Sequence, residues 1–285
     1  MGTLFTETKT HILLLFIFFF TLPVILGCSP VPGEVEMMDP KQVITLIAER
    51  GDTTWDLVAL GDSTPTGKGV GAQHSYVQVC AGYLEEDLGV DVTVHNWATN
   101  KFRPVAGWVE EVRNNQELRE DLRNAEVITI WLGWHDVIPN IGLGKGGPCY
   151  QRDEVDLDCL RGVTGPMQNG FDELLSEIVA MANPAETLIL IADVGIPGRF
   201  VAKWKEFGTL DLLKREAYEV WRDHIIQSAS DHKVYVVHTY EVINGPNGDQ
   251  ESQEYLQSDG LHFNEQGHEL LADIHRKLWS EDSSP

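Results

Sequence analysis

Strand-like and helix-like segments alternate along almost the whole chain, and this alternation is the feature that most constrains the fold. Short apolar runs rich in β-branched residues predict strands at 58–60, 92–94, 127–132, 188–192 and 234–237. Longer segments between and beside them predict helices at 40–50, 75–88, 107–124, 170–182, 211–230 and 265–279. Because strands that alternate with helices are joined by crossovers, we expect one α/β domain: a five-stranded parallel sheet with helices on both faces.

The N-terminal segment is typical of a targeting sequence. Lys9 precedes an apolar run over residues 12–26, which is interrupted by Pro23 and ends at Gly27 and Cys28. The run is shorter than the roughly 20 residues of a membrane-spanning helix, which favours a signal peptide. The four residues that end at Cys28 also resemble the bacterial lipobox, in which the cysteine is acylated and becomes the mature N-terminus.

These features predict the organisation of the chain. We expect a signal peptide at 1–27, a lipidated cysteine, tether and leading helix at 28–52, the α/β domain at 53–280 and a tail at 281–285. The protein is then extracytoplasmic, at the cell surface or in the periplasm, and either lipid-anchored or secreted.

The net charge argues against two classes of partner. The 285 residues carry a formal charge of −23 at pH 7. A chain this acidic repels polyphosphate, so we do not expect nucleic acid as a partner. It also repels anionic bilayers, so we expect membrane attachment through the lipid on Cys28 rather than through a basic surface. We expect a monomer.

Two of the four cysteines bracket a short acidic loop. Cys149 and Cys159 are spaced for a loop-closing disulfide, which an oxidising compartment would allow. A zinc site is the alternative, but no Cys-x-x-Cys accompanies them. His268, six residues after His262, lies within the last predicted helix and is expected to be a surface or packed residue, so we expect no metal. Cys80 is expected in the core.

Two short segments far apart in the sequence can supply a hydrolytic triad. Ser63 follows the first predicted strand, and Asp259 and His262 lie three residues apart near the C-terminus. A serine hydroxyl needs an imidazole to take its proton and a carboxylate to orient that imidazole. Because loops at the carboxyl ends of parallel strands gather at one edge, the fold need only bring Ser63 to this pair.

Both segments resemble motifs of the SGNH hydrolases, also called GDSL esterases and lipases. Residues 59–63 read Ala-Leu-Gly-Asp-Ser, and residues 258–264 read Ser-Asp-Gly-Leu-His-Phe-Asn. The resemblance covers roughly residues 56–279 and implies a flavodoxin-like three-layer α/β/α sandwich. It also implies Ser63 as nucleophile, Asp259 and His262 as acid and base, and no cofactor.

The middle motifs depart from the family pattern. Where the family has Gly-x-Asn-Asp, with the Asn donating to the oxyanion, this chain has His135 in the sequence Gly-Trp-His-Asp. An imidazole can still donate one hydrogen bond. The family's glycine in the loop after the second strand falls at Lys101. The resemblance thus implies an oxyanion hole made by the Ser63 amide, His135 and the Lys101 amide.

The expected activity is hydrolysis of carboxylic esters through an acyl-enzyme intermediate at Ser63. The resemblance leaves the substrate open among small-molecule esters, acylated glycans and lipid acyl esters. Short acyl or acetyl groups are favoured, because the 149–159 loop and the Gly-rich segment 142–147 are expected to crowd the site. Trp97, Trp131 and Trp134 are either acyl-pocket or core residues. The alternative function is that of a surface-tethered binding lipoprotein on an SGNH-like scaffold, with little or no hydrolytic activity.

Overall fold

The structure is a computed structural model that describes residues 37–142, 147–151 and 154–280. The predicted signal peptide, Cys28 and the tail at 281–285 lie outside these described residues. No helix in the described ranges is long and apolar enough to cross a bilayer.

The predicted sheet is confirmed, with all five strands parallel. Its order is β2-β1-β3-β6-β7. The strands are β1 (Thr54–Gly61), β2 (Asp91–Asn96), β3 (Val127–Trp131), β6 (Leu188–Ala192) and β7 (Tyr235–Val237). Every residue of β3 and β6 is buried, which agrees with their continuous apolar sequences.

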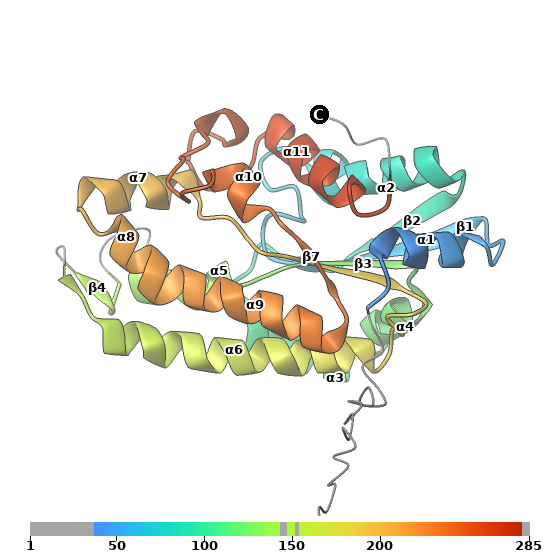
Figure 1. The fold of residues 1–285 in the computed structure, drawn as a ribbon, viewed down its shortest axis with the longest axis horizontal. Helices are drawn as coiled ribbons and strands as arrows, with labels where there is room; N and C mark the ends of the chain where they lie inside the picture. Colours follow the sequence, from blue (N-terminus) through green and yellow to red (C-terminus); the bar gives the residue numbers. More distant parts are fainter. Residues whose placement is uncertain (1–36, 143–146, 152–153, 281–285) are drawn as a thin grey trace, which may run out of the picture. The chain divides into compact units, whose positions relative to one another are not determined.

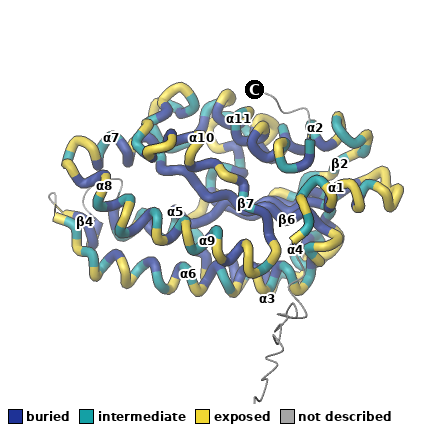
Figure 2. The backbone as a smooth tube through the Cα atoms, in the orientation of Figure 1, coloured by how far each residue is buried: buried dark blue, intermediate teal, exposed yellow. Residues whose placement is uncertain are grey.

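Helices cover both faces of the sheet, as expected for a three-layer α/β/α fold (Figure 1). Helix α2 packs against α11 on one face, and α6 packs against α3 and α9 on the other. Figure 2 shows the sheet as the buried centre between these layers. The longer helices are α1 (Pro40–Ala48), α2 (Tyr76–Leu88), α3 (Val105–Asn114), α4 (Gln116–Asn124), α6 (Leu157–Val179), α9 (Glu219–His232) and α11 (Glu265–Arg276).

Three further helices occupy segments where no helix was expected. They are α5 (Trp134–Ile141), α7 (Gly198–Glu206) and α10 (Tyr240–Asn244). The helix expected at 211–230 consists of the short α8 (Leu210–Leu213), a π-helical turn, Lys214–Tyr218, and α9. The single helix expected at 107–124 is two helices, because the Asn115 side chain accepts the amides of Glu117 and Leu118 and caps a new helix.

The leading helix belongs to the same compact unit as the sheet. Asp39 caps α1 and forms a capping box with Gln42, and Pro40 occupies the first turn. The helix buries Val43, Ile44 and Ile47. The domain boundary expected at residue 53 therefore does not separate α1 from the described domain.

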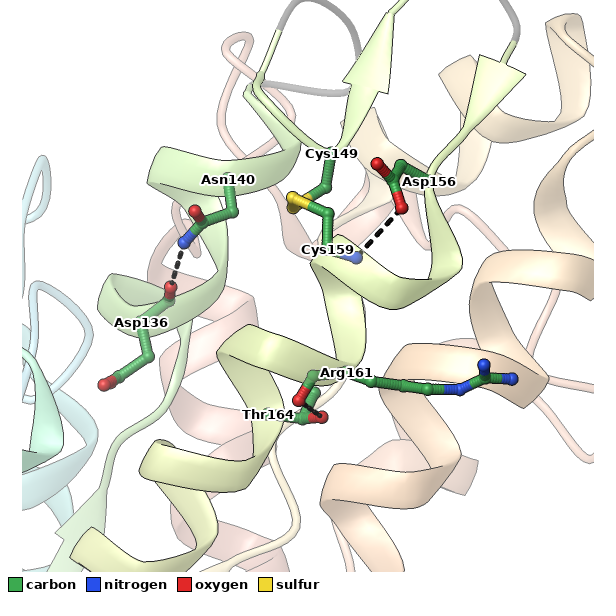
Figure 3. Close-up of a disulfide and its surroundings, with 7 residues drawn as sticks. All are labelled: Asp136, Asn140, Cys149, Asp156, Cys159, Arg161 and Thr164. Carbon is green, nitrogen blue, oxygen red and sulfur yellow. Dashed lines mark hydrogen bonds between the residues drawn. A yellow bond between two sulfur atoms is a disulfide. The ribbon is translucent and has the colours of Figure 1, made fainter.

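A disulfide joins Cys149 to Cys159, with the two Cα atoms 5.3 Å apart (Figure 3). It closes a loop that contains the small hairpin of β4 (Tyr150–Gln151) and β5 (Glu154–Val155). The loop is tied to α5 as well, since the Cys149 amide donates to the Asn140 carbonyl at 2.8 Å. Asp156 accepts the Cys159 amide and caps α6 on the far side of the loop.

Candidate active site

Ser63 lies in a tight turn directly after β1. A Cβ at Gly61 would come within 2.7 Å of the Trp131 carbonyl oxygen, so the close approach of β1 and β3 requires glycine there. The Ser63 carbonyl accepts the Lys68 amide at 3.3 Å and the Thr66 hydroxyl at 2.7 Å. Among the described residues, no acceptor takes the amide hydrogen of Ser63. This N–H is therefore available to a ligand.

Asp259 and His262 are held by a small hairpin before α11. Leu256 and Phe263 form an isolated antiparallel bridge, and the Gln257 amide donates to the His262 carbonyl at 2.8 Å. In the turn between them, Asp259 Oδ1 accepts the His262 amide at 3.0 Å, and Asp259 Oδ2 lies 2.6 Å from His262 Nδ1. The predicted spacing thus brings the carboxylate and the imidazole together from one turn.

The electrostatics of the pair suit a proton-accepting imidazole. Partial burial raises the pKa of the Asp259 carboxyl, but hydrogen bonds from the His262 side chain and from two backbone amides outweigh burial and leave this pKa below its ordinary value. An ionised Asp259 accepts a proton of His262 at Nδ1. The Nε2 atom of a neutral His262 then carries the free lone pair.

Ser63, His262 and His135 line one cavity of about 80 Å³ at the carboxyl edge of the sheet. The rest of its lining is mostly apolar and comes from β3, α5, the segment after β6, α10 and the hairpin. The apolar residues are Trp131, Trp134, Ile138, Val194, Ile196, Pro197, Ile243, Leu256, Leu261 and Phe263. Three polar groups that converge on an apolar cavity are typical of a ligand site.

Asp62 adds a buried carboxyl beside Ser63. Burial raises the pKa of Asp62, while the Thr64 amide and the nearby imidazoles of His135 and His262 act in the opposite direction. Both histidines therefore lie within electrostatic reach of the residue that precedes Ser63.

His135 reaches the cavity because α5 begins abruptly after β3. Gly133 has a φ of +132°, and a Cβ there would lie 1.8 Å from the Trp221 ring, so only glycine fits. His135 Nδ1 lies 3.2 Å from the Arg103 amide nitrogen and 3.3 Å from the Arg103 carbonyl oxygen. In the tautomer whose Nδ1 accepts the amide hydrogen, the proton of the neutral ring is on Nε2.

Lys101 is not brought to the cavity. Its side chain is exposed, and its amide donates to the Thr99 hydroxyl at 3.1 Å. The loop after β2 contacts the Ser63 turn through other groups, since the Thr99 amide donates to the Gly61 carbonyl at 3.0 Å. This geometry does not favour the predicted role of the Lys101 amide.

The crowding expected from the 149–159 loop is also not observed. No described residue of the segments 147–151 and 154–159 lines the cavity, and 143–146 lie outside the described residues. Trp131 and Trp134 do line it, whereas Trp97 donates to Asp121 away from the cavity. Sequence analysis missed the residues 194–197 and the Arg103 amide, because neither carries a motif.

Asp193, which follows β6, has a structural role and does not line the cavity. It is fully buried and accepts the amides of Thr239 and Tyr240, and the Arg222 guanidinium lies 3.0 Å from its Oδ2. Within the described ranges, no cluster of His, Cys, Asp or Glu has the arrangement of a metal site.

A model of the GDSL-like lipase/acylhydrolase family matches residues 59–270. The chain belongs to this family. As a GDSL-like hydrolase, it is a carboxylic ester hydrolase. No curated protein matches it.

Solved structures of GDSL-like and related esterases share the fold. A lipase from a goat rumen metagenome is 21% identical, with a TM-score of 0.63 over 81% of this chain and 100% of that chain. The acetylxylan esterase of Geobacillus stearothermophilus is 17% identical, with a TM-score of 0.57 over 81% and 96%. A two-domain esterase active on acetylated mannans is 13% identical, with a TM-score of 0.53 over 86% and 54%. At these identities, the likeness is one of fold.

Proposed function

We propose that this hydrolase cleaves short-chain carboxylic esters through an acyl-enzyme intermediate on Ser63. The observation that carries the proposal is the 2.6 Å contact between His262 Nδ1 and Asp259 Oδ2, in a hairpin that lines the same cavity as Ser63. Ser63 Oγ attacks the ester carbonyl carbon while His262 Nε2 takes its proton. The C–O bond to the alcohol then breaks, and His262 returns the proton to the leaving oxygen.

Water completes the reaction in the same geometry. His262 takes a proton from water, the hydroxide attacks the acyl carbon, and the bond to Ser63 Oγ breaks as the proton returns to the serine. In both tetrahedral intermediates, the oxyanion accepts hydrogen bonds from the free Ser63 amide and from the Nε2–H of His135. We leave the Lys101 amide out of this hole, because Thr99 already accepts its hydrogen.

The size of the cavity supports a preference for short acyl groups. An apolar cavity of about 150 Å³ holds a benzene molecule, so the cavity of about 80 Å³ has room for an acyl group of roughly two to four carbons. Acetyl esters are accordingly the first substrates to test. The structural relatives active on acetylated xylan and mannans share the fold and support the same choice.

The test is turnover of a p-nitrophenyl ester series, from acetate to octanoate, by the purified full chain and by Ser63→Ala. We expect kcat/KM to be highest for the short esters and to vanish in the variant. A fluorophosphonate probe should label the wild type and not Ser63→Ala. A folded wild type that neither turns over an ester nor takes the label would contradict the proposal and favour a tethered binding protein.

We also propose that the enzyme acts outside the cytoplasm, anchored through acylated Cys28. The disulfide between Cys149 and Cys159 supports this location, because such bonds persist in oxidising compartments. Metabolic labelling with a fatty acid should mark the wild type and not Cys28→Ala. Equal labelling of the wild type and Cys28→Ala would contradict a lipid anchor at Cys28.

A further inference from the structure

Trp134 is a fixed and buried part of the wall of the catalytic cavity. Its side chain is 5% exposed, and its indole N–H donates to the Gly195 carbonyl at 3.1 Å. The ring stacks on Phe200 at a centroid distance of 5.2 Å and meets the edge of Trp221 at 5.4 Å. Tyr218 also stacks on the indole, at a centroid distance of 6.2 Å. A residue held by a hydrogen bond and by three aromatic contacts forms a rigid boundary.

Trp134 also lines a second apolar space. It is small, about 10 Å³, and is lined by aromatic and aliphatic side chains. They are Trp134, Val137, Ile141, Trp204, Leu213, Ala217, Tyr218 and Trp221. Of the described residues, Trp134 alone lines both this space and the catalytic cavity. The two hollows are therefore separated by one side chain.

The buried apolar wall that includes Trp134 suits the acyl group rather than the alcohol. The alcohol leaves after the first step, whereas the acyl group stays on Ser63 until water attacks. Trp134, Val194 and Ile196 line the cavity and are buried and apolar, so they would bury acyl methylenes. An acyl chain directed at this wall would end at Trp134.

We propose that Trp134 sets the acyl length that this esterase accepts, and that the apolar space behind it would become an extension of the acyl site if the indole were smaller. The inference rests on the proposed ester hydrolysis at Ser63. It assigns acyl-length specificity to a residue adjacent to His135 in sequence but apart from the reacting atoms.

Trp134→Leu tests the inference, because leucine keeps the boundary apolar while opening the passage. Each buried methylene is worth about 0.8 kcal/mol, or roughly a fourfold change in kcat/KM. For two added methylenes, we expect the ratio of kcat/KM for p-nitrophenyl hexanoate to that for the butyrate to rise roughly fifteenfold in Trp134→Leu. Trp134→Phe should give an intermediate ratio.

Trp204→Leu is the matched control. Trp204 lines the second space but not the catalytic cavity, so its truncation removes the same volume while the boundary stays. Its ratio should equal that of the wild type. If Trp134→Leu hydrolyses the short esters but keeps the wild-type ratio, or if Trp204→Leu shifts it equally, the inference is wrong.

Binding without turnover separates this inference from the proposed mechanism. In the Ser63→Ala background, we would measure calorimetrically the affinities for acetate, butyrate, hexanoate and octanoate, both with Trp134 intact and with Trp134→Leu added. Affinity should rise with chain length beyond butyrate only after the substitution. Identical length profiles in both proteins overturn the inference, even where the wild type hydrolyses esters. Loss of hydrolysis with a retained shift in binding would instead contradict only the proposed function.

Discussion

Asp259 and His262 form one rigid unit, because the same short turn supplies both side chains and two backbone amides that bind the carboxylate. Asp259 Oδ1 accepts the amides of Leu261 and His262, which leaves Oδ2 for the imidazole at 2.6 Å. This arrangement fixes the ring with its Nδ1–H toward the carboxylate. We therefore expect the carboxylate to contribute by fixing the tautomer of His262.

Asp259→Asn tests this role. An amide at this position can donate to Nδ1 and favour the wrong tautomer, so we expect kcat/KM for p-nitrophenyl acetate to fall on the order of 10²–10⁴-fold. The thermal midpoint should change little, since the side chain is partly exposed. A rate within about threefold of the wild type would contradict the assignment of Asp259.

His135 presents a separate expectation at the oxyanion. Removing one donor from an oxyanion hole costs on the order of 10²–10³ in turnover, so His135→Ala should lower kcat by about this factor. His135→Asn retains a side-chain N–H donor and should keep much of the activity. Equal kcat values for the alanine variant and the wild type would show that the ring does not contact the oxyanion.

Among the elements, α5 shows where prediction from sequence stops. The five strands and the long helices follow from apolar runs and helical spacing, and the Ser63 and Asp259–His262 segments are recognisable as motifs. Helix α5 is short, contains Pro139 and begins at a glycine, so no periodic pattern identifies it. Its place at the cavity depends on how Gly133 fits against Trp221, a contact between distant segments.

The walls of the cavity escape prediction for the same reason. Residues 194–197 form a loop with no motif, and their approach to Ser63 follows from the pairing of β6 beside β3. The Lys101 expectation depends on aligning a loop by sequence alone, and in the structure the Thr99 hydroxyl accepts the Lys101 amide. Local sequence predicts the elements, and packing between them decides what reaches the cavity.

The first turn of α5 also contains a carboxyl whose ionisation couples stability to pH. Asp136 accepts the Val105 amide at 3.0 Å, and burial raises the pKa of Asp136 from 3.8 to about 6. The folded protein therefore binds this proton more tightly than the unfolded chain does. The contribution of Asp136 to stability is greatest in its protonated form and is lost as the pH rises from about 4 through about 6.

Asp136→Asn removes this titration. The quantity to compare is the free energy of unfolding of the variant minus that of the wild type. We expect this difference to rise by on the order of 2–3 kcal/mol between pH 4 and pH 8, because the wild type loses the contribution of protonated Asp136. Urea unfolding at several pH values measures the difference. Asp211→Asn, at a side chain that is 94% exposed, is the control and should show no such trend. A difference between Asp136→Asn and the wild type that stays constant with pH would contradict the expectation.

At the scale of the whole molecule, the charge of −23 acts on any charged substrate that approaches. We expect kcat/KM for an anionic ester, acetylsalicylate, to rise severalfold as ionic strength increases, because salt screens the repulsion. Phenyl acetate is the neutral control and should change little over the same range of salt. Equal salt dependence for the two esters would show that the net charge does not influence encounter with substrate.

The division of the site between β1 and the last hairpin also has a consequence for biosynthesis. Ser63 is translated early, whereas Asp259 and His262 emerge from the ribosome only after all five strands have been made. A nascent or truncated chain that stops before the last hairpin can therefore contain all five strands and still lack the base that the proposed mechanism requires. If that mechanism holds, esterase activity begins only after His262 has been made, and a product that ends before it is chemically silent.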